Sequence, residues 1–274
     1  MDLMLRNAAV VVTGGSRGIG RAIALAFARE GARVAICGRD TAALADAAAA
    51  IGAHAADCLP IRADLSDADA CRRVIDDAAA RFGRLDVLVN NASSNVDGAP
   101  RSLEEATDAQ VMARLEGKLL GAVRCARAAL PHMRRAGGGR IVHIGGSSAR
   151  AVFRAGEVPG NGSGLPQGLG NAALANFSKH LADEVAGDRI LVNVVHPHVT
   201  RTDRHPARVA ARAAQRGITA EAAEAEIDWL FPLGRIVEVD DIAPLVVFLA
   251  SKLAGAITGQ AIAVDAGAAR TIAY

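Results

Sequence analysis

Residues 13–20 read Thr-Gly-Gly-Ser-Arg-Gly-Ile-Gly and follow a run of mostly β-branched residues, Ala8–Thr13. A glycine-rich turn between a strand and a helix is typical of nucleotide sites, although the spacing here is G-x-x-x-G-x-G rather than G-x-G-x-x-G. Gly14 permits the tight turn, whereas Gly18 and Gly20 leave room for a pyrophosphate or for close helix packing. The first amides of the helix would face the phosphates. This context predicts a nucleotide site, with a purely structural turn as the alternative.

The rest of the chain alternates short apolar runs with longer helical stretches. Such alternation predicts βαβ units and a parallel sheet. The strands are apolar throughout, which indicates that helices cover both faces of the sheet. Besides 8–13, we expect strands at 33–37, 59–63, 86–90, 140–144, 190–196 and 261–264. We expect helices at 18–30, 41–51, 67–82, 108–135, 172–185, 207–229 and 240–250.

The length of 274 residues is consistent with one domain spanning 1–274. Two stretches read as insertions within it, at 150–170, which is rich in glycine and proline, and at 202–230. Both follow the ends of expected strands, where open α/β sheets bind their ligands. We therefore expect these two insertions to be loops that shape a substrate site.

Composition excludes several classes of function. The formal net charge is +2 with no basic block, which argues against nucleic acid or an anionic membrane as a partner. No apolar run reaches the roughly 18 residues of a membrane helix, and residues 1–6 do not read as a secretion signal. The four cysteines lie far apart, so reduced core thiols are favoured over a zinc site or disulfides. We expect a cytoplasmic protein without a metal site.

Further motifs follow the glycine turn in order: Ala63-Asp64-Leu65, Asn90-Asn91-Ala92, Leu130-Pro131-His132-Met133, Gly139-Arg140-Ile141-Val142, Val192-Asn193, Pro197, Thr202, Thr258-Gly259-Gln260 and Asp265-Ala266-Gly267. With these motifs the chain resembles the short-chain dehydrogenase/reductases over nearly its whole length. The resemblance implies a Rossmann-type, doubly wound parallel sheet of about seven strands in a single domain. It also implies a homotetramer or homodimer acting on a small molecule.

The resemblance also implies which residues bind the dinucleotide, with Asp64 at the position that binds the adenine ring. An acid after the second strand would favour NAD, because it binds the ribose 2′-hydroxyl and repels a 2′-phosphate. Here Gly38 and Arg39 stand there, and Arg39 with Arg17 could hold that phosphate. We expect NADP(H) rather than NAD(H), with solvated surface arginines as the alternative. The expected cofactor residues are Gly14, Ser16, Arg17, Gly18, Ile19, Gly20, Arg39, Asp64, Leu65, Asn91, Ala92, Pro197, Val199 and Thr202.

The catalytic Asn, Ser, Tyr and Lys of the family have no counterparts here. The family's Leu-Ala-x-Glu segment matches 181–184, which places Asn171 at the Lys and Gln167 at the Tyr. Aligning Lys179 with the Lys instead leaves alanine at the Tyr, and the only tyrosine of the chain is Tyr274.

The catalytic Ser position is also altered. Gly146 falls on it, so Ser147 or Ser148 could serve only if the strand end shifts. Polar loop serines are the plain alternative.

Lys118 stands at the family's Asn, so the chain has exchanged Asn and Lys between two positions that meet in one pocket. Burial there would lower the Lys118 pKa toward a range useful for proton transfer, whereas a solvated helix lysine is the alternative. His198 replaces a glycine near the nicotinamide and could act as acid or base, as could His196 with less support. We expect His143 to be a satisfied core group. The candidate catalytic residues are Lys118, Asn171, Gln167, Ser147 and His198.

These features favour an NADP(H)-dependent oxidoreductase that transfers hydride to or from a C=O or C=N group of a small molecule, with a non-standard proton donor. Two alternatives stay open. One is a catalytically inactive NADP(H)-binding homologue that acts as a sensor or partner subunit. The other is a non-redox lyase or isomerase on the same fold. The identity of the substrate is not encoded in any motif.

Overall fold

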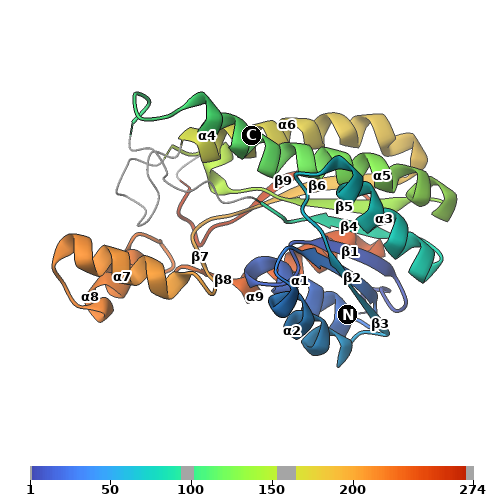
Figure 1. Cartoon of the computed structure of the whole chain (residues 1–274), viewed down its shortest axis with the longest axis horizontal. Helices are drawn as coiled ribbons and strands as arrows, with labels where there is room; N and C mark the ends of the chain where they lie inside the picture. The colour runs from blue at the N-terminus through green and yellow to red at the C-terminus, as the bar shows by residue number, and fades with distance from the viewer. Residues whose placement is uncertain (1, 94–101, 153–164, 270–274) are drawn as a thin grey trace.

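The computed structural model describes residues 2–93, 102–152 and 165–269. Its centre is a parallel sheet of seven strands in the order β3-β2-β1-β4-β5-β6-β9 (Figure 1). The expected doubly wound fold is confirmed, and every strand lies within two residues of its expected bounds. The strands of this sheet are β1 (Ala9–Thr13), β2 (Arg33–Gly38), β3 (Asp57–Arg62), β4 (Val87–Asn90), β5 (Gly139–Ile144), β6 (Ile190–Pro197) and β9 (Ala261–Val264).

Helices cover both faces of the sheet, as its uninterrupted apolar strands require (Figure 1). Val10 and Val12 of β1 pack toward α1 (Gly18–Arg29), α2 (Thr41–Gly52) and α9 (Val239–Ala250). Val11 points to the opposite face, which carries three further helices. These are α3 (Ala68–Phe82), α5 (Gly121–Ala136) and α6 (Leu165–Val185). Within the described residues no helix is both long and apolar enough to cross a membrane.

The strand order changes direction between β1 and β4. The strands that follow β1 in the chain, β2 and β3, lie on one side of it, whereas β5 and β6, which follow β4, lie on the other side. In open α/β sheets a crevice forms outside the carboxyl ends of the strands at such a point, and ligands bind in it. The glycine turn after β1 and the Asn90-Asn91-Ala92 segment after β4 therefore meet at this edge.

The helix expected at 108–135 is interrupted. It consists of α4 (Asp108–Leu115), a π-helical turn at Glu116–Leu120 and α5. Thr107 and Gln110 form a reciprocal capping box that fixes the start of α4. π-turns of this kind are rare and often occur at functional sites, and Lys118 lies in this one.

The helix expected at 172–185 begins seven residues earlier, at Leu165. The stretch before Ala172 contains Gly168 and Gly170, which suggested a loop, but a glycine is tolerated where another helix approaches closely. A Cβ on Gly170 would lie 3.4 Å from the Cβ of Lys118. Because α6 begins at Leu165, Gln167 and Asn171 lie on one helix, which packs against the π-turn at Gly170.

The helical segment expected at 207–229 is two helices, α7 (His205–Arg216) and α8 (Ala220–Trp229), separated at Gly217 with φ +66°. They project from the sheet and enclose their own small apolar core (Figure 1). A two-stranded ribbon of β7 (Thr200–Arg201) and β8 (Val237–Glu238) connects this pair to the rest of the molecule. The pair coincides with the insertion expected at 202–230. Residues 153–164 of the other insertion lie outside the described residues.

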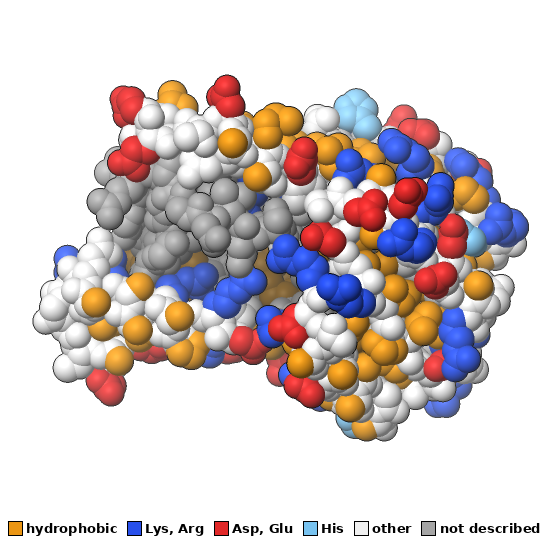
Figure 2. Space-filling view, viewed as in Figure 1, with side chains coloured by type: hydrophobic (Ala, Val, Ile, Leu, Met, Phe, Trp, Pro, Cys, Tyr) orange, Lys and Arg blue, Asp and Glu red, His pale blue; other side chains and the backbone are white. Residues whose placement is uncertain are grey.

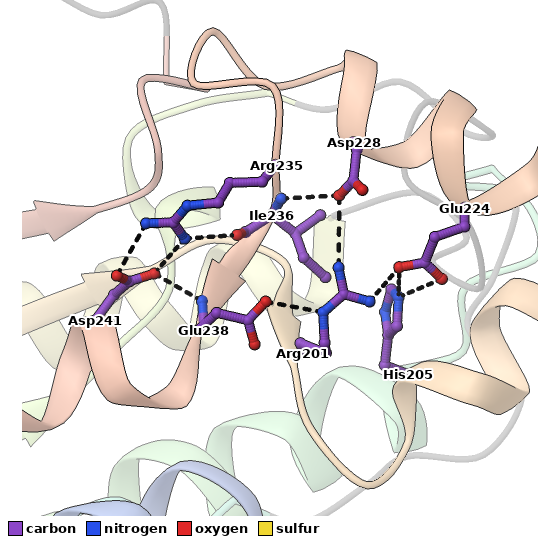
Figure 3. A network of polar contacts seen from close by, with 8 residues as sticks. All are labelled: Arg201, His205, Glu224, Asp228, Arg235, Ile236, Glu238 and Asp241. Carbon is purple, nitrogen blue, oxygen red and sulfur yellow. Dashed lines mark hydrogen bonds and ion pairs between the residues drawn. The ribbon is translucent and has the colours of Figure 1, made fainter.

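An ionic network holds the α7–α8 pair to the ribbon (Figure 3). Arg201 contacts Glu224, lies 2.8 Å from Glu238 and lies 3.7 Å from Asp228. His205, buried beside it, has its Nε2 2.9 Å from Glu224. We call these five residues the Arg201 network. Each carboxylate of this network faces a cationic or N–H donor, and we call the network closed in the sense that its charges are paired. The buried Nδ1 of His205 has no hydrogen-bond partner among the described residues.

Candidate functional site

The glycine turn is bound directly to the segment that follows β4. The Thr13 hydroxyl oxygen accepts the backbone N–H groups of Asn91 at 2.9 Å and Ala92 at 3.1 Å. The Asn91 side chain donates to the carbonyls of Thr13 at 3.0 Å and Gly14 at 3.2 Å. Gly14 has φ +64°, and a Cβ there would lie 3.0 Å from the Ala92 backbone. The turn is therefore fixed by contacts that only glycine permits.

The start of α1 offers its amides to a ligand. Arg17 at the N-cap is extended and makes no side-chain capping bond to the first turn. Gly18 has φ +52°, and a Cβ there would lie 3.4 Å from the Thr202 side chain. Uncapped amides with the positive end of the helix dipole form an anion site. The residues present here fit the diphosphate of a dinucleotide.

Asp40 was missed by the sequence analysis, although it lies next to Arg39. Its side chain caps α2 by accepting the Ala43 N–H at 3.1 Å, and it pairs with Arg17 at 2.5 Å. The Ala43 amide and then Arg17 lower the Asp40 pKa. An Asp just before a helix is an N-cap signal that could have revealed it. Arg17 therefore has a carboxylate partner, while Arg39 is exposed beside them.

The other expected cofactor residues lie along the same edge. Ser16 faces the end of β2, because a Cβ on Gly38 would lie 3.0 Å from its hydroxyl. Asp64 accepts the Ser66 amide at 3.0 Å, and that bond together with the charge of Arg39 lowers its pKa. The remaining positions, Ile19, Gly20, Leu65, Pro197 and Val199, lie in α1, after β3, at the end of β6 and just beyond it.

Lys118 is buried rather than solvated, with 9% of its surface exposed. Its ammonium donates to the Ile144 carbonyl at the end of β5, over 2.6 Å. Burial, with the nearby charge of Arg114, lowers its pKa to about 8. An amine of this kind is protonated at neutral pH yet able to release its proton.

Asn171 also reaches the end of β5. Its amide donates to the Ser148 hydroxyl at 3.0 Å, and a Cβ on Gly146 would lie 2.6 Å from that amide nitrogen. A serine at Gly146 would therefore displace Asn171 from its present position. Lys118 and Asn171 thus converge on the same strand end.

Ser147 and Gln167 differ in what their polar atoms do. The Ser147 hydroxyl is buried and donates to the Pro197 carbonyl at 2.9 Å, which ties β5 to β6. The side-chain oxygen of Gln167 is buried and has no hydrogen-bond partner in the described part of the chain. Ser147 is thus engaged in a backbone contact, whereas Gln167 retains an acceptor at the start of α6.

His198 is held against the α7–α8 side of the site. Its Nδ1 accepts the Val199 N–H at 2.7 Å, and its ring meets Phe231 edge-on at 5.0 Å. Burial lowers its pKa to about 4, so the ring is neutral near pH 7.

Two buried histidines accompany Lys118. His143 and His196 are 0% and 1% exposed, and the charge of Lys118 acts on both. Burial, with this charge, lowers the His143 pKa to about 3; burial with Arg150 and Lys118 lowers the His196 pKa to about 4. The expectation that His143 is fully satisfied is wrong: Nδ1 lies 3.3 Å from the Asn90 amide, but Nε2 is buried without a partner among the described residues. We call Lys118, His143 and His196 the Lys118 cluster.

A groove of about 910 Å³ runs between α1 and the α7–α8 pair. It reaches the nucleotide edge at Gly18 and Thr202 and passes Arg21 and Val209. Figure 2 shows basic side chains gathered on this face between the projecting helices and the rest of the molecule. The lining of the groove itself carries both signs, with arginines beside aspartates and glutamates. Among the described residues no cluster of His, Cys, Asp and Glu could hold a metal ion.

The chain is similar to known proteins over almost its full length. A family model described as enoyl-(acyl carrier protein) reductase matches residues 14–269. The rhamnolipid biosynthesis 3-oxoacyl-[acyl-carrier-protein] reductase of Pseudomonas aeruginosa is 34% identical over 261 residues, covering 94% of each chain.

Solved structures agree with this similarity. L-sorbose reductase from Gluconobacter frateurii, complexed with NADPH and L-sorbose, superimposes with a TM-score of 0.89 at 30% identity, covering 99% of this chain and 100% of that one. The NADP active-site complex of Pseudomonas aeruginosa RhlG gives a TM-score of 0.83 at 30% identity, covering 97% and 98%.

Proposed function

The chain belongs to the short-chain dehydrogenase/reductase family, and on that premise we propose that it is an NADP(H)-dependent oxidoreductase acting on a C=O or C=N group of a small molecule. The observation that carries this proposal is the nucleotide edge: a glycine turn fixed by Asn91, next to the uncapped start of α1. Free amides at the start of a helix bind phosphate groups, and this supports the proposal. Relatives solved with NADPH or NADP share the fold at about 30% identity.

Different residues of this edge would bind different parts of the cofactor. The amides of Gly18 and Ile19 would hold the diphosphate, Asp64 the adenine, and Asn91 the turn itself. Pro197, Val199 and Thr202 would border the nicotinamide. When bound, NADPH supplies the hydride, and the protein supplies orientation and the proton.

NADP(H) is favoured over NAD(H) by the charges at the end of β2. Arg39 is exposed there, and no acid occupies its position. Asp40 follows, but its carboxylate is engaged with Arg17 and with the first turn of α2. A 2′-phosphate at this point would meet two guanidinium groups and one carboxylate that is ion-paired with Arg17.

We assign the proton transfer to Lys118, because the tyrosine and lysine of the family are absent. Its ammonium lies at the end of β5, and burial places its pKa near 8. In reduction, the Lys118 ammonium would transfer a proton to the substrate oxygen as hydride reaches the carbon. Asn171 lies on the facing helix and would orient the same pocket. We further propose that the α7–α8 pair and the segment at 150–170 bound the substrate.

A second candidate function follows from Gly146 and Ser147. One has no side chain and the other donates to the Pro197 carbonyl, so neither offers a hydroxyl to a substrate in this arrangement. A cofactor-binding protein without turnover, or a non-redox enzyme, would be consistent with that loss. Net consumption of NADPH with any substrate excludes the first, and product without cofactor consumption would favour the second.

Calorimetric titration of NADPH and NADH into the purified protein tests the proposal. We expect tight binding of NADPH and at least tenfold weaker binding of NADH. Such a result would justify assaying ketones, enones and iminium compounds for NADPH oxidation. If neither dinucleotide binds, the nucleotide edge is a structural remnant and the oxidoreductase assignment fails.

A further inference from the structure

His196 lies at the end of β6 with its ring against the end of β5. The Gly146 N–H donates to His196 Nδ1 over 3.0 Å. A ring nitrogen that accepts a hydrogen bond carries no proton, so a neutral ring holds its proton on Nε2. The ring is neutral near pH 7, because burial and the charges of Arg150 and Lys118 lower its pKa to about 4. His196 thus presents an Nε2–H donor.

That donor is unsatisfied in the described part of the chain. The Nε2 atom is buried and has no hydrogen-bond partner there, and the residue as a whole is 1% exposed. A buried donor without an acceptor is destabilising, so such groups are rare unless a ligand uses them.

Gly145 makes room for this ring. A Cβ at Gly145 would overlap His196 Nδ1 and lie 2.7 Å from its Cε1. Any other residue at 145 would therefore displace the imidazole. The two residues form one arrangement: the glycine empties the space at the strand end, and the histidine fills it.

The other two members of the Lys118 cluster also present donors. Lys118 uses its ammonium on the Ile144 carbonyl and keeps further N–H groups, since an ammonium has three. His143 accepts from the Asn90 amide, which also donates to the Ala122 carbonyl at 3.3 Å, so its free Nε2 is a second N–H. Among the described residues, no carboxylate affects the charge of Lys118. A site of this composition is complementary to a negatively charged oxygen.

We infer that His196 Nε2–H and the Lys118 ammonium form a two-donor oxyanion site, which takes the place of the missing serine and tyrosine hydroxyls. This inference rests on the proposed function and assigns His196, rather than His198, as the second residue at the substrate oxygen. In reduction by NADPH, hydride adds to the carbonyl carbon and the C=O π pair moves to oxygen. His196 donates a hydrogen bond to that oxygen and keeps its proton, while Lys118 gives up one proton, leaving an alcohol and a neutral amine.

The test uses formate as an oxyanion probe, titrated into the ¹⁵N-histidine-labelled protein with and without NADP⁺. Long-range ¹H–¹⁵N spectra report the tautomer of His196 without any substitution. We expect the Nε2–H tautomer, a shift of its ¹⁵N resonance on adding formate, and at least tenfold weaker formate binding in His196→Ala. His180→Ala on the exposed side of α6 is the matched control and should bind formate as the wild type does.

Two further variants separate the donor from the fold. Gly145→Ala leaves the histidine in the sequence but pushes its ring aside, and we expect the same loss of formate affinity. In the double variant Gly145→Ala/His196→Ala the ring is gone, so the new methyl group fits and thermal stability should exceed that of Gly145→Ala alone.

An Nδ1–H tautomer, or formate affinity unchanged in both His196→Ala and Gly145→Ala, would overturn the inference. These results are independent of turnover. Failure of NADP⁺ to bind the wild type would instead contradict the proposed function, and the formate arm without NADP⁺ would still decide the role of His196.

Discussion

The Arg201 network and the Lys118 cluster are two concentrations of polar side chains in one chain, and they are built differently. In the Arg201 network a guanidinium contacts three carboxylates, and His205 contacts one of them (Figure 3). In the Lys118 cluster an ammonium and two imidazoles lie together without a described carboxylate, and both imidazole Nε2 atoms lack partners in the described part of the chain.

The difference separates a structural role from a chemical one. Closed networks fix the position of an element, here the α7–α8 pair on its ribbon. Open clusters of buried donors lower stability, and a fold retains them where a ligand completes the set. Substitution of Arg201 in the closed network and of Lys118 in the open cluster tests this contrast.

The largest expected effect is on turnover in Lys118→Met. Removing the proton donor should lower the rate of NADPH-dependent reduction at least tenfold and leave the dissociation constant of NADPH nearly unchanged. Loss of a buried cation should also raise the melting temperature, since methionine fills the volume without a desolvated charge. Steady-state kinetics, calorimetry and thermal unfolding check the three readouts. Unchanged turnover would remove Lys118 from the mechanism.

Arg201→Met should act in the opposite direction on stability. The substitution leaves Glu224, Asp228 and Glu238 close together without their shared cation. Because Arg201 is partly exposed, we expect a loss of about 1–3 kcal/mol in the free energy of unfolding. Urea unfolding monitored by circular dichroism measures the loss, and a variant as stable as the wild type would mean that the network does not hold the α7–α8 pair.

Arg39→Ala tests an exposed charge that belongs to neither cluster. We expect NADPH affinity to fall by about tenfold and NADH affinity to fall much less, because only NADPH carries the 2′-phosphate. Calorimetric titration of both dinucleotides gives the ratio, and Arg135→Ala, at the exposed end of α5, serves as a control. Equal losses for both dinucleotides would place the 2′-phosphate elsewhere.

Lys118 also predicts a pH dependence of stability. Its pKa in the folded protein is about 8, and an unfolded chain has a lysine pKa of about 10.4. Between these values the unfolded state holds a proton that the folded state has released, so raising the pH favours the folded state. The free energy of unfolding of the wild type should rise relative to Lys118→Met by up to about 3 kcal/mol over this range. Parallel curves for the two proteins would show that the amine is not desolvated.

Local patterns in the sequence predicted the glycine turn and the position of the segment that contacts it. The turn at 13–20 and the Asn90-Asn91-Ala92 segment are short motifs whose backbone geometry needs those residues, and the structure brings them into direct hydrogen-bond contact. The strand bounds could be predicted because buried parallel strands are short, uninterrupted apolar runs. Asp40 carries a helix-capping signal one position after Arg39, and the sequence analysis did not use that signal.

The catalytic end was less predictable, because it depends on contacts between distant segments. The resemblance predicted that Lys118 and Asn171 share one pocket, but burial of the amine against Ile144 needed the π-turn and the close approach of α6 at Gly170. The sequence ranked His196 below His198, because the space that Gly145 leaves for the His196 ring cannot be read from local patterns. Propensity and periodicity carry no information about such a pair.

The central claim is that Lys118 delivers a proton while NADPH delivers a hydride, in a pocket that lacks the family's tyrosine. The most direct measurement follows deuterium from C4-deuterated NADPH into the products of a panel of ketones and enones, for the wild type and Lys118→Met. We predict deuterated product from the wild type, at least tenfold less of it from Lys118→Met, and equal NADPH affinity for both proteins. Equal deuterium incorporation by the two proteins would contradict the role of Lys118, and no incorporation by the wild type despite bound NADPH would contradict the assignment as an oxidoreductase.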